Sequence, residues 1–311
     1  MSISFFAPLK KMIYGDLKVS AFVVTRLFDH EIKESVFLRA GNIDIDITKR
    51  HCMICLDPFC IAIWLQPEQF NSFDPANVNI FFKKGKTLKS KLSLSLIEKI
   101  EEDKTVLLLY RANHASCYQL NFFTRFVTLF RFLKNKTTTY RQRKFIAALY
   151  SYPRKIIVVS YKEDNYCNIF PMDIQGYIPD SNLYVLGLRT TNLTLGKILS
   201  TKKIVISDTN KADIKTIYSL GKHSASSPPP LESLRFAVSN SEQFNFPVPD
   251  FSSSYKEVEI IQHRELGYHM LMIGKVINTK ETQSEPSLLY HVHILEFMNS
   301  GYPNSGKDII F

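Results

Sequence analysis

The chain has 311 residues, of which 45% are hydrophobic and 22% charged, and its formal net charge is +10. These values are typical of folded proteins and exclude a disordered or fibrous chain, and the length allows two domains. No apolar run is long enough to span a bilayer, and the N-terminal segment MSISFFAPLKK lacks the long apolar core of a signal peptide. Five cysteines, an odd number, fit a reducing compartment. We therefore expect a cytoplasmic protein.

The excess of positive over negative charge lies entirely in the first half of the chain. Residues 1–150 carry 23 basic and 13 acidic residues, whereas residues 151–311 carry 16 of each. Two stretches concentrate the basic residues, 83–91 and 125–144, and in the second of them phenylalanines alternate with the charges. One interpretation is an anion-binding face for nucleic acid, acidic lipid or a phosphorylated ligand, and the other is a solvated helix face above an apolar stripe. No zinc-finger spacing or aromatic RNA-binding motif is present, so we do not expect nucleic acid as the partner.

Alternating apolar and polar residues dominate the second half and predict a small antiparallel β-barrel. Two shorter segments, 193–201 and 212–221, have helical spacing, and residues 224–233 form a Pro/Ser-rich loop. The predicted strands are 155–161, 182–188, 203–207, 256–263, 269–277 and 288–295.

The first half repeats part of this pattern. Residues 55–65 have a turn leading into an apolar strand, as residues 176–188 do, and residues 92–110 predict a helix followed by a strand, as residues 193–207 do. An ancient duplication explains both similarities, and so does chance recurrence of common patterns. The charge step and the polar run 135–144 place a boundary that divides the chain into a basic domain, 1–138, and a second domain, 139–311.

The segment LGLRTTNLT, residues 186–194, ends a predicted strand in a polar cluster at the start of a predicted helix. Hydroxyl, amide and guanidinium donors at a helix N-terminus are suited to bind an anion. An ordinary N-cap would use the same residue types. The residues concerned are Arg189, Thr190, Thr191, Asn192 and Thr194.

Four segments of the second half, in order, resemble the flavin reductase-like, FMN-binding split barrel family over about residues 140–292. Residues 143–161 are similar to the family's opening helix and first strand, and residues 168–192 to its central hairpin with the flavin-phosphate cluster. Residues 267–276 are similar to its Gly-Asp-His strand, and residues 287–292 to its closing Pro-Leu-x-Tyr segment. The chain departs from the family at Tyr268, where the usual residue is Asp, and at Pro171, Met172 and Asp173, where many members have Thr or Ser.

The resemblance implies a mainly β fold, an antiparallel split barrel preceded by a basic N-terminal domain that is itself a candidate diverged split barrel. It implies FMN as cofactor, NAD(P)H as co-substrate, hydride transfer between them, and paired barrels, as a homodimer or as an intramolecular pseudo-dimer. The alternatives are a flavin-binding carrier or sensor without enzymatic activity, and an anion- or nucleic-acid-binding module that has lost flavin.

The resemblance also assigns site residues. The polar cluster at 189–194 would bind the flavin phosphate, and one strand would lie along the flavin ring through its backbone. His269 and His223 are the catalytic candidates, although a buried core histidine and a loop histidine, respectively, are the alternatives. The strand residues are Asn168, Ile169, Phe170, Pro171, Met172 and Asp173.

The segment HCMIC, residues 51–55, with Cys60 nearby, has a spacing that occurs in zinc sites. The segment also predicts a strand, in which residues three apart point to opposite faces and cannot share a metal. We therefore expect buried, inert thiols and no metal.

Overall fold

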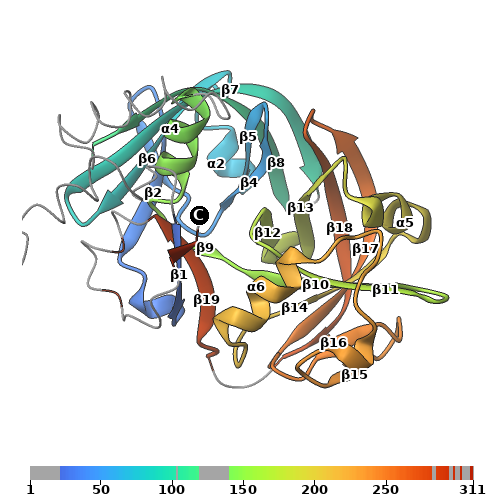
Figure 1. The fold of residues 1–311 in the computed structure, drawn as a ribbon. Coiled ribbons are helices and arrows are strands. Elements are labelled where there is room, and N and C mark those ends of the chain that lie inside the picture. The colour runs from blue at the N-terminus through green and yellow to red at the C-terminus, as the bar shows by residue number, and fades with distance from the viewer. Residues whose placement is uncertain are drawn as a thin grey trace, which may run out of the picture.

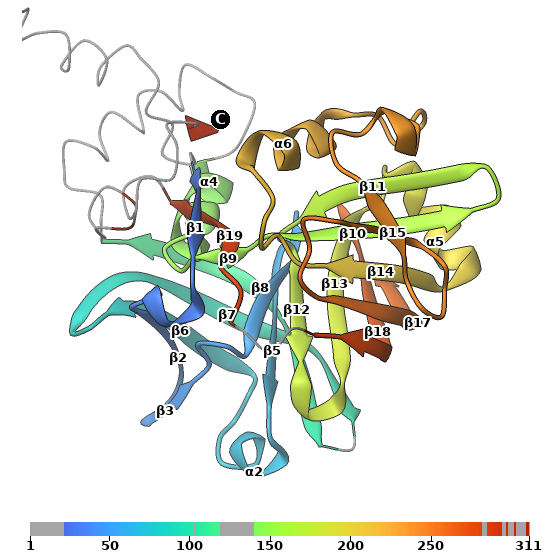
Figure 2. The same ribbon diagram turned by 90° about the horizontal axis from the view of Figure 1, so that it is seen from below.

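The computed structural model describes residues 22–102, 104–118, 140–281 and 285–293, together with Phe297, Tyr302, Ile309 and Ile310. Two curled, antiparallel, seven-stranded sheets make up most of it (Figures 1 and 2). The first sheet has the order β3 (Ile43–Asp46), β2 (Glu34–Ala40), β6 (Asn77–Lys84), β7 (Thr87–Glu102), β8 (Thr105–Cys117), β5 (Phe59–Leu65), β4 (His51–Leu56). The second has the order β11 (Tyr166–Met172), β10 (Ile157–Glu163), β14 (Lys203–Ser207), β17 (Tyr255–Glu265), β18 (His269–Lys280), β13 (Leu183–Arg189), β12 (Gln175–Ile178).

The two sheets have the same topology. When the strands of each sheet are numbered in chain order, both sheets have the order 2-1-5-6-7-4-3. The β4–β5 hairpin corresponds to the β12–β13 hairpin, and the β7–β8 hairpin to the β17–β18 hairpin.

Smaller elements surround the sheets. A third sheet joins both ends of the chain, because β1 pairs with β19 and β20, and β19 pairs with β9. Its strands are β1 (Phe22–Leu27), β9 (Arg154–Lys155), β19 (Leu288–His293) and β20 (Ile309–Ile310), and a ribbon is formed by β15 (Val238–Asn240) and β16 (Pro247–Pro249). The helices are α2 (Pro67–Phe70), α4 (Tyr140–Leu149), α5 (Leu193–Thr201) and α6 (Ile214–Lys222), with single 3-10 turns η1 (Asp29–Glu31), η2 (Pro179–Ser181) and η3 (Leu231–Ser233).

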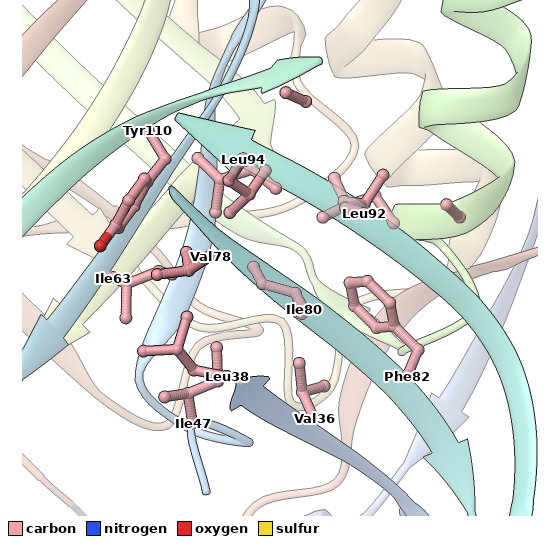
Figure 3. Packing of buried hydrophobic residues seen from close by; sticks show 14 of the residues in the cluster. Val36, Leu38, Ile47, Ile63, Val78, Ile80, Phe82, Leu92, Leu94 and Tyr110 are labelled. Atoms are coloured by element: carbon pink, nitrogen blue, oxygen red, sulfur yellow. The ribbon is translucent and has the colours of Figure 1, made fainter. Parts of the chain in front are cut away.

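The first sheet curls around an apolar core (Figure 3). Alternate residues of β2, β6 and β7 point into it, among them Leu38, Ile80 and Leu92, which are fully buried. The last residues of α4 also belong to this core, so the helix that precedes the second sheet packs against the first. The boundary at residue 138 stays a prediction, since both α4 and β1 pack across the two parts of the chain.

The two sheets contact each other face to face along β4, which packs against β12, β13 and β18. A separate apolar cluster fills this contact and includes Ile54 and Trp64 from the first sheet and Val185 and Ile273 from the second. At Gly187 the contact is so close that an added Cβ would clash with the backbone carbonyl of Ile54. Glycine is therefore required there to let the two backbones approach.

The prediction of a mainly β, antiparallel fold is confirmed, and so are the six predicted strands and the two helices of the second half. The helix predicted at the start of 92–110 is wrong, because these residues belong to strands β7 and β8. Consequently the first repeat pair, 55–65 with 176–188, matches the shared topology, whereas the second pair does not. Of the basic stretch 125–144, residues 125–139 lie outside the described residues, and residues 140–144 belong to α4.

The cysteine-rich segment forms strand β4 as predicted. The prediction that residues three apart on this strand face opposite sides is wrong. A β-bulge between Met53 and Cys55 shifts the alternation, so that Cys52 and Cys55 share one buried cluster. Burial raises the pKa of the Cys52 thiol to about 12 and that of Cys60 to about 12 as well, so both are protonated and unreactive near neutral pH. Among the described residues no three potential metal ligands lie together, and no helix is long and apolar enough to cross a membrane.

The close contact at Gly187 gives a test of the sheet-to-sheet packing. Gly187→Ala should lower the free energy of unfolding by about 1–3 kcal/mol, because the methyl group meets a backbone carbonyl that cannot move aside. Gly196→Ala is the matched control: Gly196 lies in α5 with open space around its Cβ position, so alanine should be neutral or stabilising by up to about 1 kcal/mol. Urea denaturation measures both changes, and equal stability of the two variants would contradict this packing.

Candidate functional site

A cavity of about 350 Å³ lies in the second half of the chain, where β11, β13 and β18 meet α5 and α6. Its volume is at the lower end of the range for small-molecule sites. The walls combine polar and apolar groups, and Phe170, Met172 and Leu188 are among the apolar lining residues. Its polar side chains are Asn168, Asp173, Arg189, Asn192, His223 and His269.

Nine of the predicted site residues line this cavity: Asn168, Phe170, Pro171, Met172, Asp173, Arg189, Asn192, His223 and His269. Four do not. Ile169 faces the opposite side of β11, in another apolar cluster, and Thr194 is fully buried. Thr190 and Thr191 lie on the turn between β13 and α5 and are not among the lining residues.

Arg189 and His269 form one polar pair of the site, because they lie opposite each other where β13 ends and β18 begins. The guanidinium of Arg189 is exposed and stacks on the ring of Tyr268, 5.5 Å from its centroid. Tyr268 is the residue at which the chain departs from the resembled family. Arg189 is the one cation among the described residues that line the cavity.

His269 is only 1% exposed. Burial lowers its pKa to about 4, an effect to which the nearby charge of Arg189 adds and which Asp173 opposes, so the imidazole is neutral near pH 7. The amide N–H of Leu56, in the first sheet, approaches Nδ1 at 3.4 Å, which assigns the ring proton to Nε2. Nε2 is buried and has no partner among the described residues, so the cavity contains an unused hydrogen-bond donor.

A hydrogen-bond network from α6 to α5 holds the second histidine. His223 Nε2 lies 2.7 Å from Asn168 Oδ1, and Asn168 Nδ2 donates to Thr194 Oγ1 at 2.7 Å. The acceptor role of Asn168 Oδ1 puts the proton of His223 on Nε2, which leaves Nδ1 as an unpaired buried acceptor. Burial lowers the pKa of His223, so this ring is also neutral near pH 7. Thr194 thus positions Asn168 from behind the cavity wall.

The polar turn after β13 is an N-cap, one of its two predicted roles. Asn192 is the N-cap of α5, and its side-chain oxygen accepts a hydrogen bond from the Thr194 N–H at 2.9 Å. The cap uses the amide oxygen and leaves the amide nitrogen of Asn192, which lines the cavity, available as a donor. Anion binding by this turn stays a prediction.

The basic stretch 83–91 lies elsewhere, on the hairpin of β6 and β7. The ammonium of Lys83 lies 4.7 Å from the ring centroid of Phe37, and that of Lys91 lies 5.4 Å from that of Phe81. Such cation–π contacts account for these lysines as part of a solvated sheet face.

No family model and no curated protein matches the chain. Its structure is similar to that of an FMN-binding protein from Thermus thermophilus, at 19% identity and a TM-score of 0.40, over 45% of this chain and 82% of that one. It is also similar to an NADH:FAD oxidoreductase from Streptomyces globisporus, at 13% identity and a TM-score of 0.41, over 46% and 83% of the chains. A third is nitrilotriacetate monooxygenase component B from Mycobacterium thermoresistibile, at 14% identity and a TM-score of 0.42, over 48% and 82%.

These solved structures are FMN-binding and flavin reductase proteins, as the sequence resemblance predicts. The TM-scores are near 0.4, so only the topology and the cavity of this chain itself support a function. Cytoplasmic location and dimerisation stay predictions.

The neutral state of His269 predicts a pH dependence of stability. Unfolded histidine takes up a proton near pH 6.5, whereas folded His269 does so only near pH 4, so the free energy of unfolding should fall as the pH decreases across this interval. His269→Gln should make that fall shallower, and His263→Gln, at an exposed position of β17, should leave it unchanged. Urea denaturation from about pH 7.5 to 4.5 measures both. An identical slope for wild type and His269→Gln would contradict burial of a neutral imidazole.

Proposed function

We propose that this cavity binds FMN and that the protein is a flavin reductase-like oxidoreductase that uses NADH or NADPH. The observation that carries the proposal is that the described residues lining one cavity combine apolar side chains, one arginine and two histidines with unpaired buried ring nitrogens. A flavin is a flat, largely apolar ring with a polar rim and an anionic phosphate tail, and each feature of the cavity matches one part of it.

The residues present fit the ligand as follows. Arg189 would bind the phosphate, with the amide nitrogen of Asn192 as a second donor. The apolar side chains Phe170, Met172 and Leu188 would exclude water from the ring. His269 would donate from Nε2 to an acceptor of the ring system, and His223 would accept at Nδ1.

When bound, the flavin supplies hydride acceptance from a reduced nicotinamide, which no protein side chain provides. The chain would contribute position, a dry environment and fixed hydrogen bonds. Neutral His269 suits this role, since a donor that keeps its proton is constant throughout the physiological pH range.

We also infer that the two sheets derive from one duplicated split barrel and that only the second keeps the site. Identical strand order supports the duplication. In the first sheet the pair equivalent to Arg189 and His269 is Leu65 and Val106, both apolar and buried. The helix after β5 has four residues, whereas α5 has nine, so the helix N-terminus is reduced as well. The paired barrels would thus be a pseudo-dimer within one chain.

The proposed phosphate site predicts a ligand-dependent effect. Arg189→Ala should weaken FMN binding by about 1.5–3 kcal/mol and riboflavin binding much less, because only FMN carries the phosphate. Lys215→Ala, which removes an exposed cation from α6 outside the cavity, should change neither affinity. Fluorescence quenching of the two flavins measures the difference. Equal weakening of both ligands by Arg189→Ala would refute the phosphate role.

The asymmetry of the two halves predicts one FMN per chain rather than two. Titration of the purified protein with FMN, followed by anaerobic addition of NADH or NADPH, tests stoichiometry and activity together. We expect one equivalent bound and loss of flavin absorbance on addition of the nicotinamide. Two equivalents would refute the loss of the first site. A bound flavin that neither nucleotide reduces would refute the reductase activity and leave a flavin-binding protein.

A further inference from the structure

Asp173 is the one carboxylate in the part of the cavity lining that the structure describes. It lies between β11 and β12, and its side chain is 15% exposed. Ile174, the next residue, accepts the N–H of Gly187 at 2.9 Å, and Gly187 is two residues before Arg189 on β13. This pairing brings the segment that carries Asp173 beside the end of β13, where Arg189 lies.

One oxygen of this carboxylate is held by two residues from outside the second sheet. Tyr150, which follows α4, donates its O–H to Oδ2 at 2.5 Å, and His291 of β19 donates from Nδ1 to the same atom at 2.7 Å. Oδ1 has no hydrogen bond to any described residue and is not among the buried unpaired atoms. The carboxylate is therefore fixed by one oxygen while the other is free to accept from a ligand.

The surroundings keep Asp173 ionised. Burial would raise its pKa, but the charge and hydrogen bond of His291, the hydrogen bond from Tyr150 and the charge of Arg154 together lower it below the ordinary value. The other titratable groups facing this region are Tyr218 on α6, whose hydroxyl lies 3.4 Å from His291 Nε2, and His269 on β18.

The backbone next to Asp173 lacks one hydrogen-bond donor. Pro171 has no N–H, so this strand offers one amide donor fewer to a ligand. The same segment, Pro171 to Asp173, is where the chain departs from the resembled family.

We propose that Asp173 is a specificity-determining residue of the cavity, whose free Oδ1 accepts a hydrogen bond from an N–H group of a bound heteroaromatic amide, and that Tyr150 and His291 are its positioning residues. Two ligands carry this chemistry, the flavin through its ring imide and the nicotinamide through its carboxamide. The inference rests on the proposed function.

Asp173→Asn tests the acceptor. Tyr150 and His291 both need an acceptor, so the new amide would give them its oxygen and turn its NH₂ toward the ligand, placing donor against donor. Loss of a hydrogen bond to a charged group corresponds to a decrease of about tenfold to a hundredfold in affinity. Two measurements separate the sources: the Kd for FMN, and the KM for NADH with the flavin saturating.

A rise in the FMN Kd alone identifies the flavin imide, and a rise in the KM for NADH alone identifies the nicotinamide carboxamide. If the wild type binds FMN and Asp173→Asn changes neither value, the acceptor role is refuted while the proposed function stands. If the wild type binds no FMN, the proposed function is refuted, and this inference with it.

Tyr150→Phe tests the positioning and covers the case in which Asp173→Asn does not fold. Removal of one stabilising hydrogen bond raises the pKa of Asp173, so ligand affinity should be lost on the acid side at a higher pH than in the wild type. The pH series measures both the Kd for riboflavin, which has no titrating phosphate, and the KM for NADH, so that either ligand of Asp173 is covered. Tyr152→Phe, with no hydrogen bond to Asp173, is the control. An acid limb at the same pH in all three proteins would refute the positioning role.

Discussion

The close contact between the two sheets is the constraint on which the site depends. Strand β4 of the first sheet lies against β12, β13 and β18 of the second, and a side chain at Gly187 would clash with the backbone carbonyl of Ile54 in β4. Burial of the shared apolar cluster drives this contact, since burying apolar surface is the main favourable term in folding. The same contact brings the Leu56 amide to His269 and so fixes the tautomer of a cavity residue. The first half thus shapes a site to which none of its described residues contributes a lining side chain.

The sequence predicts the second sheet well because its strands have clear alternation and its helices have helical spacing. Helix α5 coincides with its predicted range, residues 193–201. The error at 92–110 has a physical cause. Leu92 and Leu94 alternate as in a strand and are buried, but a bulge between Leu96 and Glu98 breaks the alternation, and the following Ile-Glu-Lys-Ile-Glu-Glu run has a composition that favours helices. Pairing with β6 and β8 decided the structure against that local preference.

The candidate site was predictable where it follows one strand and its turn, and not where it depends on distant segments. Asn168 and Arg189 were identified from local pattern and resemblance. By contrast, Tyr150 and His291 are 23 and 118 residues from Asp173, and no local signal marks either as its partner. Ile169, which the resemblance assigns to the site with the rest of its strand, is buried in a different apolar cluster and is not among the lining residues.

Charge distribution distinguishes the two halves more clearly than topology does. The first half carries all of the excess positive charge, yet the position equivalent to Arg189 is the buried Leu65. Its lysines at 83 and 91 lie over phenylalanine rings on a sheet face instead of lining a cavity. In the second half, where acidic and basic residues balance, Arg189 lies opposite a neutral histidine and lines the same cavity as an ionised carboxylate. Such a cavity selects a ligand by the positions of these three groups. The net charge of the chain has little effect on that selection. For this reason the uneven charge of the sequence gives little information about the site, whereas the polar end of one strand gives much.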